Sequence, residues 1–244
     1  MSAGSVRAPA TVYLQPAVWE GAEAEVSGDQ YRHLFRAKRL AVGELLRAVD
    51  GRGRAREARV GSVGPAAAVV ELGAEAPSNE AARRLTLIVA VLRPERASWL
   101  VEKATELGAH RFVWLRTGRA PRHFGPSVLE RHRRVAVAAM QQSGRSWLPD
   151  VDGPHDWQAL PGLLEGFEAR RVLDPAGRRL TAMPDEAERV AVVVGPEGGW
   201  GEAERRELEK LGCEPRSLGP RILRVETAAI AGAALLLSGA GPRR

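Results

Sequence analysis

The stretch "VVVGPEGGWGEAE", Val192–Glu204, passes from an apolar run into a cluster of glycines and then into charged residues typical of a helix. Short valine-rich runs are typical of buried strands in parallel sheets, where helices cover both faces. In such sheets, ligands bind beyond the carboxyl ends of the strands. Glycines placed there let backbone groups approach a ligand without a Cβ in the way. The stretch therefore predicts an α/β domain with a ligand-binding loop at Gly195–Gly199.

This loop does not match the common nucleotide-binding motifs. It lacks the lysine and hydroxyl residue of a phosphate-binding loop, and it lacks the three-glycine spacing of a dinucleotide fingerprint. Taken alone, the glycine loop is equally compatible with a plain turn between a strand and a helix.

The rest of the chain divides into two parts. Short apolar segments alternate with turns in the first 76 residues, with one helix expected at Gly28–Leu40, and they predict a small β-rich domain over residues 1–76. The polar segment Glu75–Arg84 contains a proline and reads as the linker. Beyond it, apolar strands alternate with amphipathic helices, which predicts an α/β domain with a mainly parallel sheet over residues 77–244.

Composition limits the class of protein. With 244 residues, 44% of them hydrophobic, the chain can bury a sizeable core, and its net charge of +6 suits a nucleic-acid partner as well as an ordinary basic enzyme. The single cysteine, Cys213, cannot form an internal disulfide, and no secretory signal is evident. Because the mostly apolar run Thr227–Pro242 is too short and too glycine-rich to cross a bilayer, we expect a cytoplasmic protein without a membrane segment.

A second loop strengthens the case for a ligand site. In "LGPRILRVETA", Leu218–Ala228, the apolar residues Ile222 and Leu223 lie between Arg221 and Arg224. A loop that mixes apolar and cationic residues suits a flat aromatic group beside an anionic one. The same segment also reads as the start of the last helix, with a capping residue and a first-turn carboxylate.

Together, the two loops carry a family resemblance. "GPEGG" followed by "LGPRILRVETA" resembles the C-terminal signature of the RsmE-type 16S rRNA uridine N3-methyltransferases of the SPOUT superfamily. "EKATELGA" (102–109), "QQSGRSWLP" (141–149) and "HLFRAKRLAVGE" (33–44), the last followed by "DGRG", resemble further segments of that family. Gln141 stands where the family usually has glutamate, so this chain has no carboxylate at that position to remove a proton.

The resemblance implies an architecture and a cofactor. The N-terminal domain would be PUA-like and bind RNA, and the C-terminal domain would carry a SPOUT trefoil knot holding S-adenosyl-L-methionine. The expected partners are 16S rRNA within the 30S ribosomal subunit and a second copy of the chain in a homodimer. The residues predicted to bind the cofactor are Gly195, Glu197, Gly198, Gly199, Leu218, Gly219, Ile222 and Leu223.

The implied reaction is methyl transfer to N3 of a uridine, and it requires help with a proton. The pKa of the uracil N3–H lies roughly two to three units above neutral pH. At about 1.36 kcal/mol per unit, deprotonation at neutral pH therefore costs about 3–4 kcal/mol. The candidate bases are Glu226 and Glu197, with Arg221 or Arg224 stabilising negative charge. The structural alternative is that Glu226 is a carboxylate in the first turn of a helix, where it interacts favourably with the helix dipole. The five histidines are scattered without metal-ligand spacing, so no metal is expected.

Arginines are the expected contacts to RNA, since arginine pairs with phosphate and stacks on bases. Any single arginine can also be explained as a solvated residue of a basic surface. Those that match family positions or lie in the expected helix of the N-terminal domain are Arg32, Arg36, Arg39, Arg119 and Arg145. Arg52, Arg54, Arg56 and Arg122 are further candidates.

Two other functions stay open at this level. One is a SPOUT methyltransferase that acts on another RNA or on a ribose 2′-hydroxyl, which product analysis would separate. The other is a non-catalytic RNA-binding or ribosome-assembly factor that retains the fold, and failure to bind S-adenosyl-L-methionine would support it.

Overall fold

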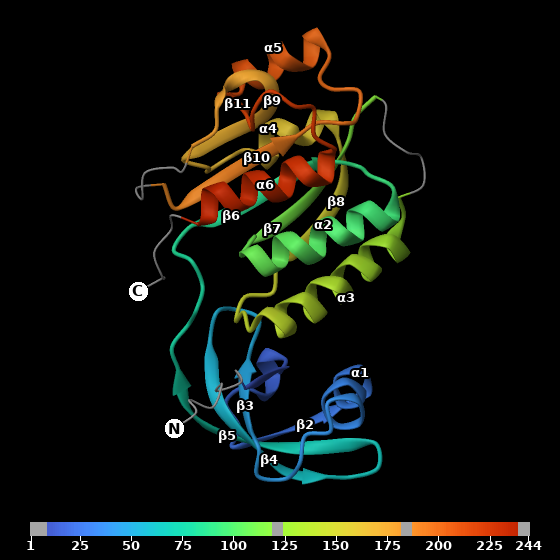
Figure 1. Ribbon diagram of the computed structural model, residues 1–244, viewed down its shortest axis with the longest axis vertical. Coiled ribbons are helices and arrows are strands. Elements are labelled where there is room, and N and C mark those ends of the chain that lie inside the picture. Colours follow the sequence, from blue (N-terminus) through green and yellow to red (C-terminus); the bar gives the residue numbers. More distant parts are fainter. Residues whose placement is uncertain (1–8, 119–123, 182–186, 239–244) are drawn as a thin grey trace, which may run out of the picture. The chain divides into compact units, whose positions relative to one another are not determined.

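The computed structural model describes residues 9–118, 124–181 and 187–238 (Figure 1). The chain divides into two compact units. The first comprises Met1–Asn79 together with Met140–Leu148, and the second comprises Glu80–Ala139 together with Pro149–Arg244. A short stretch from the middle of the chain thus belongs to the N-terminal unit.

The first unit is built on one sheet of five strands in the order β1-β3-β4-β5-β2. β1 and β3 pair in parallel, and the other neighbours pair antiparallel. Val12, Leu34, Ala48 and Val70 are fully buried in its core. The predicted β-rich domain is confirmed, with β2 as an additional strand. The strands are β1 (Ala10–Tyr13), β2 (Glu23–Ser27), β3 (Leu45–Val49), β4 (Ala55–Val63) and β5 (Ala67–Ala76).

The helix predicted at Gly28–Leu40 is present but shorter and less regular. A single turn, α1 (Gly28–Tyr31), continues as a π-helical segment, Arg32–Ala37. The helix ends there because Arg39 adopts a left-handed backbone conformation, with φ of 59°. A residue with that dihedral cannot continue a right-handed helix.

The second unit is an α/β domain with a six-stranded sheet in the order β11-β9-β10-β6-β7-β8. Every neighbouring pair is parallel, which confirms the predicted class. β8 was not predicted, because its sequence "DVDGPHD" is polar and contains glycine and proline. The strands are β6 (Arg84–Ala90), β7 (Arg111–Arg116), β8 (Asp150–Asp156), β9 (Ala169–Arg179), β10 (Arg189–Val194) and β11 (Glu214–Ser217).

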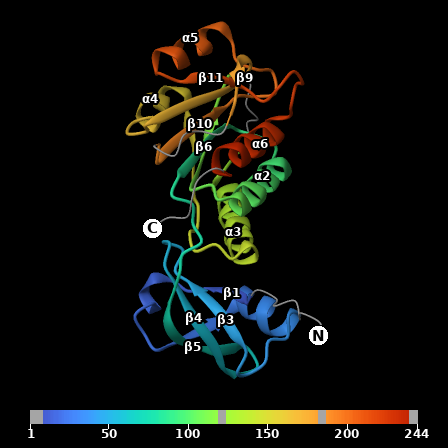
Figure 2. The same ribbon diagram turned by 60° about the vertical axis from the view of Figure 1, so that its left-hand side comes forward.

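Helices cover both faces of this sheet (Figure 2). α2 (Pro94–Leu107) and α6 (Val225–Leu237) lie side by side on one face, with α3 (Pro126–Ser143) beside α2. α4 (Leu160–Leu163) and α5 (Glu202–Lys210) cover the opposite face. Because both faces are covered, β6 and β10 are apolar almost throughout instead of alternating. Among the described residues, no helix is both long enough and apolar enough to span a membrane.

Candidate functional site

A cavity of about 330 Å³ lies at the carboxyl ends of β10 and β11, beside the middle of β9. Parallel sheets bind ligands at this edge. All eight residues predicted to bind a cofactor contribute to its wall. They are Gly195, Glu197, Gly198 and Gly199 in the loop after β10 and Leu218, Gly219, Ile222 and Leu223 in the loop after β11.

The loop Gly195–Gly199, called the glycine loop below, depends on glycine at two positions. A Cβ on Gly195 would lie 2.6 Å from Cε2 of Trp200, which is closer than side-chain atoms can approach. Gly199 has a φ of 69°, in the left-handed region that favours glycine. The glycines thus fix the path of the loop and leave its backbone facing the cavity.

The loop after β11 supplies the apolar part of the wall. Gly219 has a φ of 119° and turns the chain, so that Leu218, Ile222 and Leu223 all reach the cavity. Ile222 is 81% exposed, an unusual state for a large aliphatic side chain that nothing else in the unit covers. An apolar ligand surface placed in the cavity would cover it.

A third segment of the wall was missed by sequence reasoning. Asp174 and Pro175 follow Leu173 in β9 and line the cavity beside Arg205 of α5. Arg205 Nε donates to Asp174 Oδ2 at 2.8 Å. Burial disfavours the charged form of this carboxyl, but hydrogen bonds from Arg205 and from the Ala176 N–H outweigh it and lower the pKa of Asp174. The Asp174–Arg205 ion pair thus forms part of the cavity wall.

The two candidate bases occupy different environments. Glu197 lines the cavity and its side chain is 65% exposed. Glu226 does not line the cavity; it lies in the first turn of α6, with its side chain 6% exposed. Glu226 Oε2 is buried and has no hydrogen-bond partner among the described residues. Only Glu197 therefore has direct access to a ligand in this conformation.

Both carboxylates meet one arginine that sequence reasoning did not select. Arg96, in the first turn of α2, pairs through Nη1 with Glu197 Oε1, and its Nε lies 3.8 Å from Glu226 Oε1. No local motif marks Arg96, because its two partners come from distant parts of the chain.

The two candidate stabilising arginines are also separated. Arg221 lines the cavity, whereas Arg224 does not. Arg224 is the N-cap residue of α6, and its carbonyl accepts the Ala228 N–H at 2.8 Å. The N-cap residue of α6 makes no side-chain capping hydrogen bond, so the alternative that this segment contains a capping residue is not supported. In the described ranges, no group of three or more His, Cys, Asp or Glu residues is placed to hold a metal ion.

The arginines predicted to bind RNA differ in availability. Arg39 is exposed, while Arg32 pairs with Asp29 and Arg36 donates to the Pro65 carbonyl at 2.6 Å. Arg145 is only 5% exposed, so it is part of the interior of the first unit and not of its surface. Arg119 and Arg122 lie outside the described residues.

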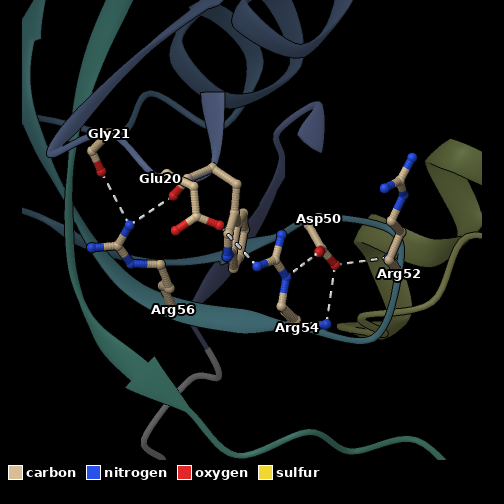
Figure 3. Close-up of polar contacts among 7 residues, drawn as sticks. Glu20, Gly21, Asp50, Arg52, Arg54 and Arg56 are labelled. Carbon is tan, nitrogen blue, oxygen red and sulfur yellow. Dashed lines mark hydrogen bonds and ion pairs between the residues drawn. The ribbon is translucent and has the colours of Figure 1, made fainter. Parts of the chain in front are cut away.

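A rigid turn in the first unit presents one further arginine (Figure 3). The fully buried Asp50 carboxylate accepts the backbone N–H groups of Arg52 and Arg54 at 2.8 and 3.0 Å, and Arg54 Nε at 2.7 Å. Arg56 is held by the carbonyls of Trp19, Gly21, Leu72 and Gly73. Arg52 turns away from this network, and no described residue hydrogen-bonds to its guanidinium. It is the arginine of this turn that is open to a partner.

Comparison with known proteins places both units in one family. Family models described as an RNA methyltransferase domain and an RNA methyltransferase PUA domain match residues 79–237 and 26–72. A protein of Mycobacterium bovis named ribosomal RNA small subunit methyltransferase E is 32% identical over 228 residues, covering 86% of this chain and 84% of the relative. The chain belongs to the ribosomal RNA small subunit methyltransferase E family. The RsmE-type resemblance and the PUA-like character of the first unit are confirmed.

Further members of the methyltransferase E family agree with this assignment. The member from Synechocystis is 30% identical over 205 residues, covering 82% of this chain and 67% of the relative. The crystal structure of the Neisseria gonorrhoeae member bound to S-adenosyl methionine superposes with a TM-score of 0.83 at 26% identity, covering 93% of this chain and 95% of that one.

Proposed function

We propose that this chain transfers a methyl group from S-adenosyl-L-methionine to N3 of a uridine in 16S rRNA of the small ribosomal subunit. The observation that carries the proposal is the cavity at the carboxyl ends of β10 and β11, whose wall contains all eight residues expected for the cofactor. The family to which the chain belongs supports the substrate class.

The wall of the cavity fits the proposed cofactor. Leu218, Ile222 and Leu223 offer apolar surface for the faces of adenine, and the glycine loop offers backbone groups for its edge. The Asp174–Arg205 pair supplies polar groups for the methionyl end or the ribose. When bound, S-adenosyl-L-methionine supplies a methyl group already activated on a sulfonium centre.

Methyl transfer also requires removal of the uracil N3 proton. Of the two candidate bases, Glu197 lines the cavity and is the first candidate to accept that proton, and Arg221, which also lines the cavity, stabilises the anion that forms. Glu226 remains the second candidate, and it needs a rearrangement before it can reach the base. Holding uracil in line with the activated methyl group supplies much of the remaining acceleration.

RNA binding in this proposal falls mainly to the first unit. Arg39 and Arg52 are exposed there and make no side-chain hydrogen bond with a described residue. Arg32 and Arg36 are also exposed and can contribute if they exchange their present partners. The target uridine has to be flipped or single-stranded to reach the cavity. Arg119 is also proposed to contact RNA, because it matches a family position.

The trefoil knot in the second domain and the homodimer are proposed on the family resemblance. The division at residues 1–76 and 77–244 and the cytoplasmic location are proposed from the sequence pattern and the composition. The dimer has additional support, because α2 and α6 leave large apolar side chains exposed on one face of the second unit. Trp99 is 45% exposed, and Leu107 and Leu235 are each 39% exposed.

Nucleoside mass spectrometry tests the reaction. The protein is incubated with S-adenosyl-L-methionine and with 30S subunits from cells that lack its gene, and the digested 16S rRNA is then analysed. New N3-methyluridine confined to 16S rRNA is the expected product. A methylated ribose, or methylation of another RNA only, would contradict the proposed atom or substrate. Absence of both methylation and cofactor binding would instead indicate a non-catalytic binding factor.

A further inference from the structure

One arginine joins the cofactor loop to the start of the last helix. Arg96 pairs through Nη1 with Glu197 of the glycine loop, and its Nε lies 3.8 Å from Glu226 Oε1 in the first turn of α6. The three residues come from three separate segments of the second unit. A planar guanidinium with several donors can serve two carboxylates at once, which a point charge cannot do as well.

Glu226 needs such a partner. Its side chain is 6% exposed and Oε2 has no hydrogen-bond partner among the described residues. A buried carboxylate without compensation is strongly unfavourable. Within the described ranges, Arg96 is the basic residue that lies within 4 Å of it. The N-terminal end of α6 adds only a partial positive charge.

The same arginine also restrains the cavity wall. Glu197 lines the cavity and is otherwise exposed, while Val225, the neighbour of Glu226, lines the cavity from α6. Through its contacts with both carboxylates, Arg96 therefore links the glycine loop to α6, and both of these segments contribute to the cavity wall.

We propose that Arg96 is a positioning residue of the cofactor site. It compensates the buried charge of Glu226 and holds the glycine loop in its binding conformation, without touching the substrate. This inference rests on the proposed function, because it assigns the cavity to S-adenosyl-L-methionine. The competing view is an ordinary half-exposed ion pair, which contributes at most about 1 kcal/mol and does not affect ligand binding.

The test compares four variants of the full-length protein. Arg96→Met removes the charge and keeps the stem, and Arg96→Lys keeps the charge but loses the planar fork. Arg93→Met is the matched control, since Arg93 is exposed at the N-cap of the same helix and its side chain makes no hydrogen bond or ion pair with a described residue. Arg96→Met combined with Glu226→Gln removes both the cation and the buried charge.

Two measurements on these variants separate the possibilities. In calorimetric titration with S-adenosyl-L-methionine, we expect Arg96→Met to raise Kd about tenfold, Arg96→Lys to recover part of the loss, and Arg93→Met to stay within twofold. In thermal melts, the double variant should unfold at a higher temperature than Arg96→Met alone, because the uncompensated carboxylate is gone.

The outcomes are distinguishable from a failure of the proposed function. If the wild-type protein itself does not bind S-adenosyl-L-methionine, the cofactor assignment fails first. If the wild type binds and Arg96→Met binds within twofold of it, the positioning role is overturned. It is also overturned if Glu226→Gln lowers the melting temperature of Arg96→Met further. Should Arg96→Met not fold, the partial loss in Arg96→Lys relative to Arg93→Met decides the question.

Discussion

The indole of Trp200 occupies the space where Gly195 would carry a side chain. A Cβ on Gly195 would lie 2.6 Å from Cε2 of that ring. Trp200 is 5% exposed, its Nε1 donates to the Leu173 carbonyl at 3.4 Å, and its ring lies 5.7 Å from that of Trp157. The buried Trp200, which directly follows the glycine loop, therefore fixes the backbone path at Gly195.

This relationship leads to the first prediction. Gly195→Ala should raise the Kd for S-adenosyl-L-methionine at least tenfold in calorimetric titration, because either Trp200 or the loop must move. Gly162→Ala is the control, since a Cβ there meets no atom within 4 Å, and we expect it to bind as the wild type does. Trp200→Phe on the Gly195→Ala background should recover part of the affinity. Unchanged binding by Gly195→Ala would contradict this account of the loop.

The sequence allowed the residues of the two loops that line the cavity to be predicted more completely than the residues around them. The wall residues of the two loops lie in short contiguous motifs after buried strands, where glycines and apolar–cationic mixtures have a direct physical meaning. Asp174 was missed although the strand that contains it was predicted, because one aspartate in "RVLDP" carries no pattern. Arg96 was missed because only the folded chain brings it to Glu197 and Glu226.

The fold shows the same contrast. Strands with continuous apolar sequence were found, whereas the polar strands β2 and β8 were not. The membership of Met140–Leu148 in the first unit could not be inferred, since its basis is tertiary: Gln141 Nε2 donates to Gln30 Oε1 at 2.7 Å, and the Leu148 N–H donates to the Gly51 carbonyl at 3.0 Å. Pairing of residues so far apart leaves no periodic signature in one sequence.

A second prediction concerns the turn that Asp50 organises. Arg52→Ala should weaken binding to the substrate rRNA roughly threefold to tenfold and reduce the salt dependence of binding by about one phosphate contact. Arg52→Lys should keep the salt dependence. Arg56→Ala is the comparison, because Arg56 is bound to backbone carbonyls, so its loss should lower the melting temperature and leave the salt slope unchanged. Filter binding at several salt concentrations measures the slopes, and equal slopes for Arg52→Ala and wild type would exclude a phosphate contact.

A third prediction concerns the exposed apolar face of α2 and α6. If this face is the interface of a homodimer, Trp99→Glu should convert a species of twice the 26.3 kDa chain mass into a monomer. Val42→Glu, which replaces a 62% exposed valine in the first unit, should not change the mass. Size-exclusion chromatography with light scattering gives both masses. A wild-type monomer at micromolar concentration would remove the dimer from the proposal.

A fourth prediction follows from a buried histidine. His132 of α3 is fully buried against Trp114 and Phe124, with ring centroids 5.2 and 5.6 Å away. Burial lowers the pKa of His132 from 6.5 to about 4. In the unfolded chain the ring takes up a proton near its ordinary pKa, whereas in the folded chain it stays neutral down to about pH 4. Protonation therefore favours the unfolded state between these two values.

The stability supplied by neutral His132 is complete above about pH 6.5 and is lost as the pH falls toward 4. By pH 5.5 the loss amounts to about 1 kcal/mol, since the free energy of unfolding follows the difference in bound protons. Chemical denaturation at pH 7.5 and pH 5.5 measures it, and His132→Phe should reduce the difference between the two pH values by that amount. An equal difference in wild type and variant would mean that His132 takes up its proton without unfolding the chain.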